Sequence, residues 1–395
     1  MSAELPLTGI TVVSCEQAVA APFASRQLAD LGARVIKVER PGVGDFARGY
    51  DTTVKGLSSH FVWINRNKES LTLDLKHPEG KGILYELIAN ADVFIQNFAP
   101  GAAERLGFGA AQLRESNSRL IHASISGYGA DGPYRNAKAY DALVQAEAGL
   151  VSITGTEESP AKTGIPTADI AAGMYTYTGV LTALFNRERT GEGATLETSL
   201  FDALVEWMGY PLYFTRYGGT RPARAGTSHA AIAPYGSFTC GDGTQIMLAV
   251  QNEREWERFA TQVLGRADLV TDERFDRAAH RFARSQELRD IIEGVFSTLT
   301  GTDCDRLLEA AAVAHSRQRD VSEIPDHPQL TERNRWREVE SPVGSVSMVE
   351  PPVTMSGVDS RMDPIPAAGQ HTDSILGELG IDTVTIDRLR ADNVV

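Results

Sequence analysis

The sequence predicts an α/β protein whose larger part is built on a parallel sheet. Over the first 130 residues, short apolar runs at 10–14, 35–38, 93–98 and 120–126 have the length and composition of buried strands. Between them, residues 22–32 and 81–90 carry apolar side chains at helical spacing. Alternating strands and helices of this size are typical of a Rossmann-like sheet with crossover helices. We therefore expect a Rossmann-like large domain.

The middle of the chain continues this domain and then changes character. Residues 141–152 and 167–187 are predicted helices rich in Ala and Gly, and TLETS at 195–199 is a predicted strand before a helix at 201–208. The stretch 217–226 is rich in Gly, Arg and Pro, as linkers are.

The remaining residues predict a smaller α+β domain and a returning tail. The pattern indicates a hairpin with strands at 235–240 and 245–250 and a turn at Gly241–Gly243, followed by helices at 253–264 and 285–299. Residues 341–365 are predicted to be extended, and a last helix starts near Thr372. The expected domains are 1–215 (large), 222–325 (small) and 330–395, a segment that returns to the large domain.

Composition excludes several classes of function. The chain has 395 residues, with 38 Lys and Arg against 52 Asp and Glu, a net charge of −14. An acidic chain argues against nucleic-acid and anionic-membrane partners. The three cysteines are far apart and show no metal-ligand spacing, so we expect no metal site. No signal-peptide pattern and no apolar run of about 18 residues is visible, which predicts a cytoplasmic protein.

Two glycine patterns match dinucleotide-binding motifs literally, at 127–132 (GYGADG) and 42–47 (GVGDFA). A dinucleotide site needs a helix N-terminus directly after the motif, because the pyrophosphate binds there. No helical periodicity follows residue 132, and the second pattern lies in the second strand–helix unit rather than the first. We therefore interpret both as turns, and a dehydrogenase is disfavoured.

Asp169 is the strongest local candidate for catalysis. It lies in PTADIAAG (166–173), where Thr167 is a natural N-cap and Asp169 falls in the first helical turn. An acidic residue there also complements the helix dipole without any catalytic role. As a nucleophile, the carboxylate would be kept ionised by the helix N–H groups, and Ala171, Ala172 and Gly173 would let a bulky ligand approach.

The sequence resembles the class III coenzyme A transferases (CaiB/BaiF type), the group that contains formyl-CoA transferase. The resemblance runs from residue 6 to about 200 and is weaker beyond. It rests on LGARVIKVERPGVGD (31–45), NRNKESLTLDLKHPEG (65–80), NFAPG (97–101), SGYG (126–129) and AD (168–169), all in the family's order.

The resemblance implies an activity and a mechanism. An aspartate, Asp169 here, attacks an acyl-CoA thioester to form a mixed anhydride, and the released CoA then forms an aspartyl-CoA thioester that the acceptor acid resolves. A carboxylate with an ordinary pKa near 3.9 is ionised at neutral pH and needs no general base. Coenzyme A is then a substrate, and no cofactor is expected. The resemblance also implies an interlocked homodimer whose crossing linkers are 217–226 and 341–365.

The resemblance also implies which residues contact CoA or substrate. They are polar or cationic groups for the thioester end and the phosphates, and apolar groups for the adenine or pantetheine. The set is Gln17, Arg40, Leu73, Lys76, Asn97, Phe98, Arg105, Leu106, Lys138 and Tyr140, with His229 in a loop that replaces a glycine-rich loop of formyl-CoA transferase.

Two rival functions remain on the same scaffold. The related alpha-methylacyl-CoA racemases use a histidine as a base at the position that precedes Asp141 in this chain. Here that position holds Tyr140, a poor base near neutrality. A non-catalytic CoA-binding protein is disfavoured by the presence of Asp169. The expected substrates are a succinyl-CoA donor and a short dicarboxylate acceptor (mesaconate, itaconate or citramalate), whose distal carboxylate Arg48 or Arg224 could bind.

Overall fold

The computed structural model describes residues 4–395, which divide into two compact units. Unit 1 consists of the chain up to residue 150 together with 163–210 and 330–395, and unit 2 consists of 151–162 and 211–329. Segment 151–162 belongs to unit 2 because Arg224 donates hydrogen bonds to the backbone carbonyls of Ser152, Thr156 and Glu157. Helices α7 (Leu150–Ile153), α10 (Gly209–Gly218) and α15 (Pro328–Thr331) lie where the chain passes between the units.

The expected parallel sheet is confirmed in unit 1. Six parallel strands lie in the order β3-β2-β1-β4-β5-β6. The order reverses between β1 and β4, and α/β sheets bind ligands at the carboxyl ends of strands at such a switch point. The strands are β1 (Thr11–Cys15), β2 (Arg34–Glu39), β3 (Lys68–Thr72), β4 (Val93–Gln96), β5 (Ile121–Ser126) and β6 (Thr195–Ser199).

Strand β3 was not predicted, because its sequence KESLT begins with two charged residues. It forms one edge of the sheet, and the C-terminal segment covers that edge: His371 N donates to Ser70 O, and Thr72 N donates to Thr372 Oγ1. An edge strand covered in this way cannot pair with another chain. The tail therefore completes unit 1.

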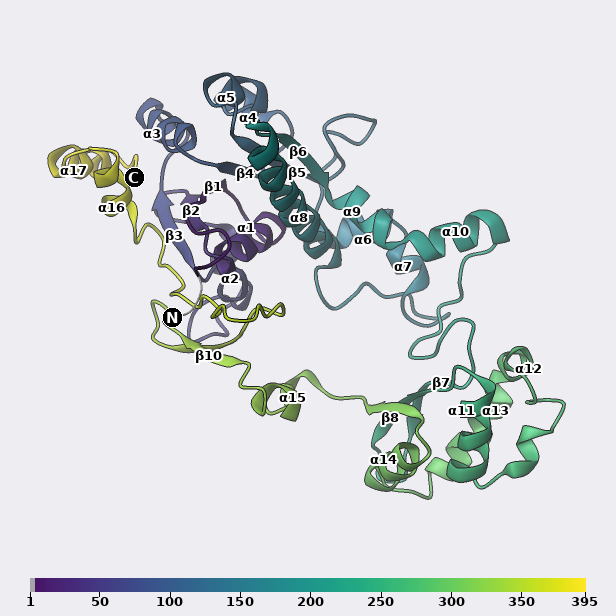
Figure 1. The fold of residues 1–395 in the computed structure, drawn as a ribbon. Coiled ribbons are helices and arrows are strands. Elements are labelled where there is room, and N and C mark those ends of the chain that lie inside the picture. Colours follow the sequence, from purple (N-terminus) through teal and green to yellow (C-terminus); the bar gives the residue numbers. More distant parts are fainter. Residues whose placement is uncertain (1–3) are drawn as a thin grey trace. The chain divides into compact units, whose positions relative to one another are not determined.

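Helices cover both faces of this sheet, which explains why β1, β2 and β4 are buried along nearly their whole length. Val12 faces α1, α6, α8 and α9, whereas Val13 faces α3, α5, α16 and α17. Figure 1 shows the long α8 running beside β5 and β6. The helices of unit 1 are α1 (Ala20–Asp30), η1 (Phe46–Gly49), α2 (Ser59–Ile64), α3 (Pro78–Ala89), α4 (Ala102–Leu106), α5 (Ala110–Ser116), α6 (Asp141–Glu147), α8 (Thr167–Thr190), α9 (Leu200–Trp207), α16 (Thr372–Glu378) and α17 (Thr383–Ala391). A hairpin of β10 (Trp336–Val339) and β11 (Val346–Val349) packs with α2.

Unit 2 has its own core around Trp256, Phe275 and Phe296. The expected hairpin is present and gains a third strand, so that β7, β8 and β9 form an antiparallel sheet. Its elements are β7 (Tyr235–Thr239), β8 (Gln245–Ala249), α11 (Glu253–Arg258), η2 (Phe259–Val263), η3 (Ala267–Val270), α12 (Ala278–Ala283), α13 (Ser285–Phe296), α14 (Gly301–Ala310), β9 (Ala314–Arg317) and η4 (Val321–Glu323). Across residues 4–395, no helix combines the length and the apolar character needed to cross a membrane.

Candidate active site

Two of the predicted CoA-binding residues meet at the switch point of the sheet. Gln17 follows β1, and Asn97 follows β4 directly. The Gln17 backbone N–H donates to Asn97 Oδ1 at 3.0 Å, and Asn97 Nδ2 donates back to the Gln17 carbonyl at 2.8 Å. The Asn97 side chain therefore holds the Gln17 backbone at the place where this class of sheet binds ligands.

Asp169 lies in the first turn of α8, as predicted, although the N-cap is Pro166 rather than Thr167. The small residues that follow it have a different role from the expected one. Ala171 and Ala172 are fully buried, and a Cβ on Gly173 would lie 2.7 Å from the Ala20 carbonyl oxygen of α1. They therefore allow α8 to pack tightly on α1, and they are not a ligand surface.

The helix N–H groups that were expected to stabilise the Asp169 carboxylate donate hydrogen bonds to Asp141 instead. Asp141 Oδ1 accepts from Ala168 N at 2.8 Å and from Asp169 N at 3.4 Å, and Asp141 Oδ2 accepts from Gln145 Nε2 at 2.7 Å. Burial and the neighbouring Asp141 charge raise the pKa of Asp169 to about 7. The expectation of an ordinary pKa is therefore wrong, because burial and the like charge of Asp141 both disfavour the ionised carboxylate.

Tyr50 interacts electrostatically with Asp169, and the sequence reasoning did not single it out. Burial, the carboxylates of Asp45 and Asp169, and Tyr140 together raise the pKa of Tyr50 to about 12. Tyr50 therefore lies within electrostatic reach of the candidate nucleophile. Asp141 was also missed, although its position directly after Tyr140 was a usable signal.

Three predicted phosphate-binding cations are exposed. Arg40 directly follows β2, Lys76 lies between β3 and α3, and Arg105 is in α4. Among residues 4–395, none of the three makes an ion pair with an acidic side chain, so their charges are available to a ligand. Of the other predicted contacts, Lys138 and Tyr140 are exposed, Phe98 and Leu106 are half-buried, and Leu73 is a core residue at 1% exposure.

The two arginines considered for a distal carboxylate are engaged inside the chain. Arg48 Nε and Nη2 donate to Glu39 at 2.8 and 2.7 Å, and its guanidinium lies 3.7 Å from the centre of the Phe61 ring. Arg224 donates to three backbone carbonyls of segment 151–162. Both guanidinium groups therefore have internal structural contacts rather than an open carboxylate site.

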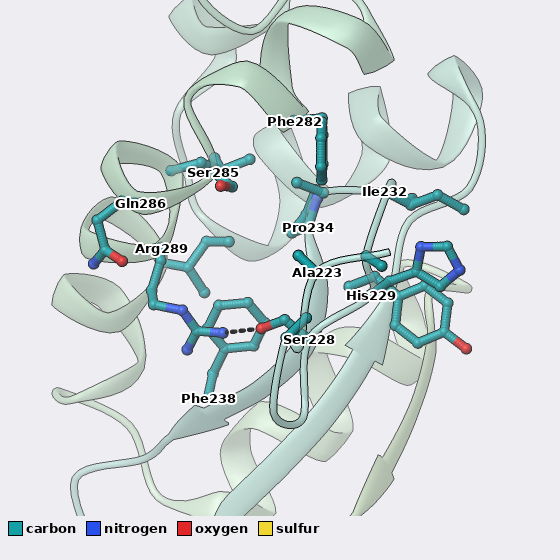
Figure 2. A pocket seen from close by; sticks show the side chains of 16 residues that line it. Ala223, Ser228, His229, Ile232, Pro234, Phe238, Phe282, Ser285, Gln286 and Arg289 are labelled. Carbon is teal, nitrogen blue, oxygen red and sulfur yellow. Dashed lines mark hydrogen bonds between the residues drawn. The ribbon is translucent and has the colours of Figure 1, made fainter. Parts of the chain in front are cut away.

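His229 lies on a cavity of about 230 Å³ in unit 2. Its ring stacks on Tyr235 with centroids 5.1 Å apart. Figure 2 shows Arg289 and His229 at opposite sides of the view, with the Arg289–Ser228 hydrogen bond of 2.9 Å drawn. Arg289 also donates to Ser237 O, and the sequence offered no signal for its place on this cavity.

The two glycine patterns occupy turns, in line with the sequence interpretation. Residues 127–132 follow β5 and lead into an irregular segment that lasts until α6 begins at Asp141. Residues 42–47 lead into the single turn of η1. Neither pattern is followed by the α-helix N-terminus that a dinucleotide pyrophosphate needs.

Comparison with known proteins agrees with this fold. The profile of CoA-transferase family III matches residues 7–372. An acetyl-CoA:oxalate CoA-transferase of Acetobacter aceti is 35% identical, over 90% of this chain and 90% of its own length. The human succinyl-CoA:glutarate CoA-transferase is 33% identical, over 99% of this chain and 90% of its own length. The crystal structure of a CAIB/BAIF family protein from Brucella suis superimposes with a TM-score of 0.85 and 31% identity, covering 95% of this chain and all of that one.

The chain belongs to CoA-transferase family III and is a CoA-transferase. The expected α/β fold class and the expected family are thereby confirmed.

The raised pKa of Asp169 predicts a pH dependence. If Asp169 is the nucleophile, only its ionised form can attack, so kcat/KM for the acyl-CoA should rise with pH, with a midpoint near 7. In Asp141→Asn the neighbouring charge is lost while the side-chain oxygen can still accept from Ala168 N. The midpoint should move to lower pH without reaching the ordinary value near 4, because burial persists.

The measurement is a pH–rate profile of both proteins between pH 5 and 9. Asp387→Asn, an exposed substitution on α17, is the control and should keep the wild-type midpoint. An unchanged midpoint in Asp141→Asn would show that the Asp141 charge does not act on the nucleophile.

Proposed function

We propose that this protein transfers coenzyme A from an acyl-CoA thioester to a free carboxylic acid, with Asp169 as the covalent nucleophile. The supporting observation is the state of the Asp169 carboxylate. It is half-buried, its pKa is near 7, and among residues 4–395 no group donates a hydrogen bond to its oxygens. Its lone pairs are therefore available for attack on a carbonyl carbon.

The proposed reaction mechanism needs no cofactor or metal. The Asp169 carboxylate attacks the thioester carbonyl, and the C–S bond breaks to give an acyl–aspartyl anhydride and CoA thiolate. The thiolate attacks the aspartyl carbonyl, which releases the donor acid and leaves an aspartyl-CoA thioester. The acceptor carboxylate then attacks this thioester, and the released thiolate attacks the acceptor's carbonyl, which restores Asp169.

We propose short dicarboxylic acids as the substrates. The relatives from Acetobacter aceti and human are named for oxalate and glutarate, both dicarboxylates. Succinyl-CoA is the proposed donor, and mesaconate, itaconate or citramalate are the proposed acceptors. His229 is a candidate contact for the acid, because its cavity of about 230 Å³ is too small for CoA but suits a small acid.

The test is a panel of acyl-CoA donors and free acids, read by mass spectrometry of the CoA products. Transfer to a dicarboxylate with release of the donor acid supports the proposal. Deuterium incorporation at the alpha carbon without any transfer would instead support the racemase. No turnover with any pair would contradict the proposed chemistry.

We also propose the interlocked homodimer that the family resemblance implied. The expected crossing linkers are corrected, because 217–226 lies within unit 2 and 341–365 lies within unit 1, and the chain passes between the units near residues 210 and 329. On α10, an exposed aromatic patch consists of Tyr213 and Tyr217, which are 61% and 80% exposed and whose stacked rings have centroids 6.4 Å apart. Such a patch marks a protein interface more often than free surface. Sedimentation velocity at micromolar concentration should show one species with the mass of two chains, and an active monomer would contradict the proposal.

A further inference from the structure

The turn after β1 has a strained backbone at Ala18. Its φ is +62°, in the left-handed region that residues with a Cβ rarely adopt. Such a conformation persists only where its surroundings hold it, and it is often found at functional sites. The strain lies next to Gln17, at the switch point of the sheet.

Asp45 also holds this turn, through the backbone N–H of Ala18. Its Oδ1 accepts from Ala18 N at 3.1 Å and from Ala47 N at 2.9 Å. Its Oδ2 accepts from Lys37 Nζ at 2.8 Å. Asp45 is 1% exposed, so water does not compete for these bonds.

Lys37 fixes the position of the Asp45 carboxylate within a buried charge network. The fully buried Lys37 ammonium also lies 3.3 Å from Glu16 Oε1, which accepts from Lys68 at 2.6 Å. Burial alone would raise the pKa of Glu16, but Lys68 and Lys37 outweigh it and hold this pKa at about 2. Glu16 therefore stays ionised at neutral pH, and its carboxylate helps to hold the Lys37 ammonium against Asp45.

We propose that Asp45 is a positioning residue for CoA transfer: by accepting the Ala18 N–H it holds the Gln17–Ala18 turn in the left-handed conformation that presents Gln17 to the acyl-CoA. This inference rests on the proposed function and on the expectation, implied by the family resemblance, that Gln17 contacts the thioester end of the acyl-CoA. Asp45 acts through Gln17 and does not touch the substrate itself.

The test combines Asp45 variants with glycine at position 18. Asp45→Ala should lower kcat about 100-fold while the KM for acyl-CoA changes little, because a misplaced reacting group costs rate rather than remote binding. Asp45→Asn should retain more activity than Asp45→Ala, since an amide oxygen can accept the same two N–H groups. The double variant Asp45→Ala/Ala18→Gly should have a kcat at least tenfold higher than that of Asp45→Ala alone, because glycine adopts positive φ without strain.

A merely structural role for Asp45 predicts no rescue by Ala18→Gly, and that result would overturn the inference. If Asp45→Ala does not fold, Ala18→Val and Ala18→Gly decide instead: the β-branched valine should lower kcat, and glycine should retain it. The matched control is Asp242→Ala in unit 2, whose carboxylate also accepts two backbone N–H groups and whose loss should spare kcat. Failure of the proposed function is distinct from these outcomes, because the wild-type protein would then show no transfer at all.

Discussion

Asp169→Asn should lower the rate of CoA transfer by at least about 10³-fold, the scale found when a covalent nucleophile is removed. Asparagine keeps the shape and the place of Asp169 in the first turn of α8 but is a far weaker nucleophile than a carboxylate. A role limited to the helix dipole would instead cost about 1 kcal/mol of stability and leave activity in place. Steady-state kinetics with a purified variant separates the two.

The same variant should remain folded, and at alkaline pH it should be more stable than the wild-type protein. The folded-state pKa of Asp169, about 7, is raised above its ordinary value, so the wild-type protein loses stability as the pH rises toward 7 and this carboxylate ionises. Asparagine does not ionise and avoids that loss. The gain in Tm of Asp169→Asn over the wild type should therefore be larger at pH 8 than at pH 4.5.

A covalent adduct provides an independent readout of the same role. Wild-type protein incubated with acyl-CoA alone should carry an adduct on the peptide that contains Asp169, and hydroxylamine should convert it to a hydroxamate. Asp387→Asn, the exposed control, should form the adduct, and Asp169→Asn should not. Transfer by Asp169→Asn at a near wild-type rate would remove Asp169 from the mechanism.

Alanine at Arg40, Lys76 or Arg105 should raise the KM for the acyl-CoA about tenfold at each position, with kcat almost unchanged. A tenfold change corresponds to about 1.4 kcal/mol, at the low end for a charge-assisted hydrogen bond and appropriate for exposed cations. The phosphates lie far from the reacting carbonyl, so these contacts are lost equally in the ground state and the transition state. Added salt should narrow the difference between wild type and variants, because exposed charges are screened.

The control is Arg306→Ala on α14 of unit 2, which removes an exposed arginine paired with Asp303. It should leave both kinetic constants at wild-type values. Wild-type kinetics in all three test variants would show that the phosphates are bound elsewhere.

Local pattern was sufficient for much of this fold. The apolar runs that became β1, β2, β4 and β5 were visible because a strand buried on both faces must be apolar along its length. The hairpin at 235–250 was visible because its turn residues and its alternation are local. Asp169 was placed in the first turn of α8 for the same reason, since helix starts have a local signature.

The sequence alone thus determined the fold class, the family motifs and the candidate nucleophile. The tertiary structure decided the pKa values and the ion-pair partners of the charged residues. The pKa of Asp169 rises to about 7 because the carboxyl group is buried and because Asp141, 28 residues away in the sequence, lies beside it. Arg48 forms an ion pair with Glu39. The polar strand β3 can lie in the buried sheet because Lys68 forms an ion pair with Glu16. Burial and Coulomb interactions depend on distance in space, and distance along the chain does not report it.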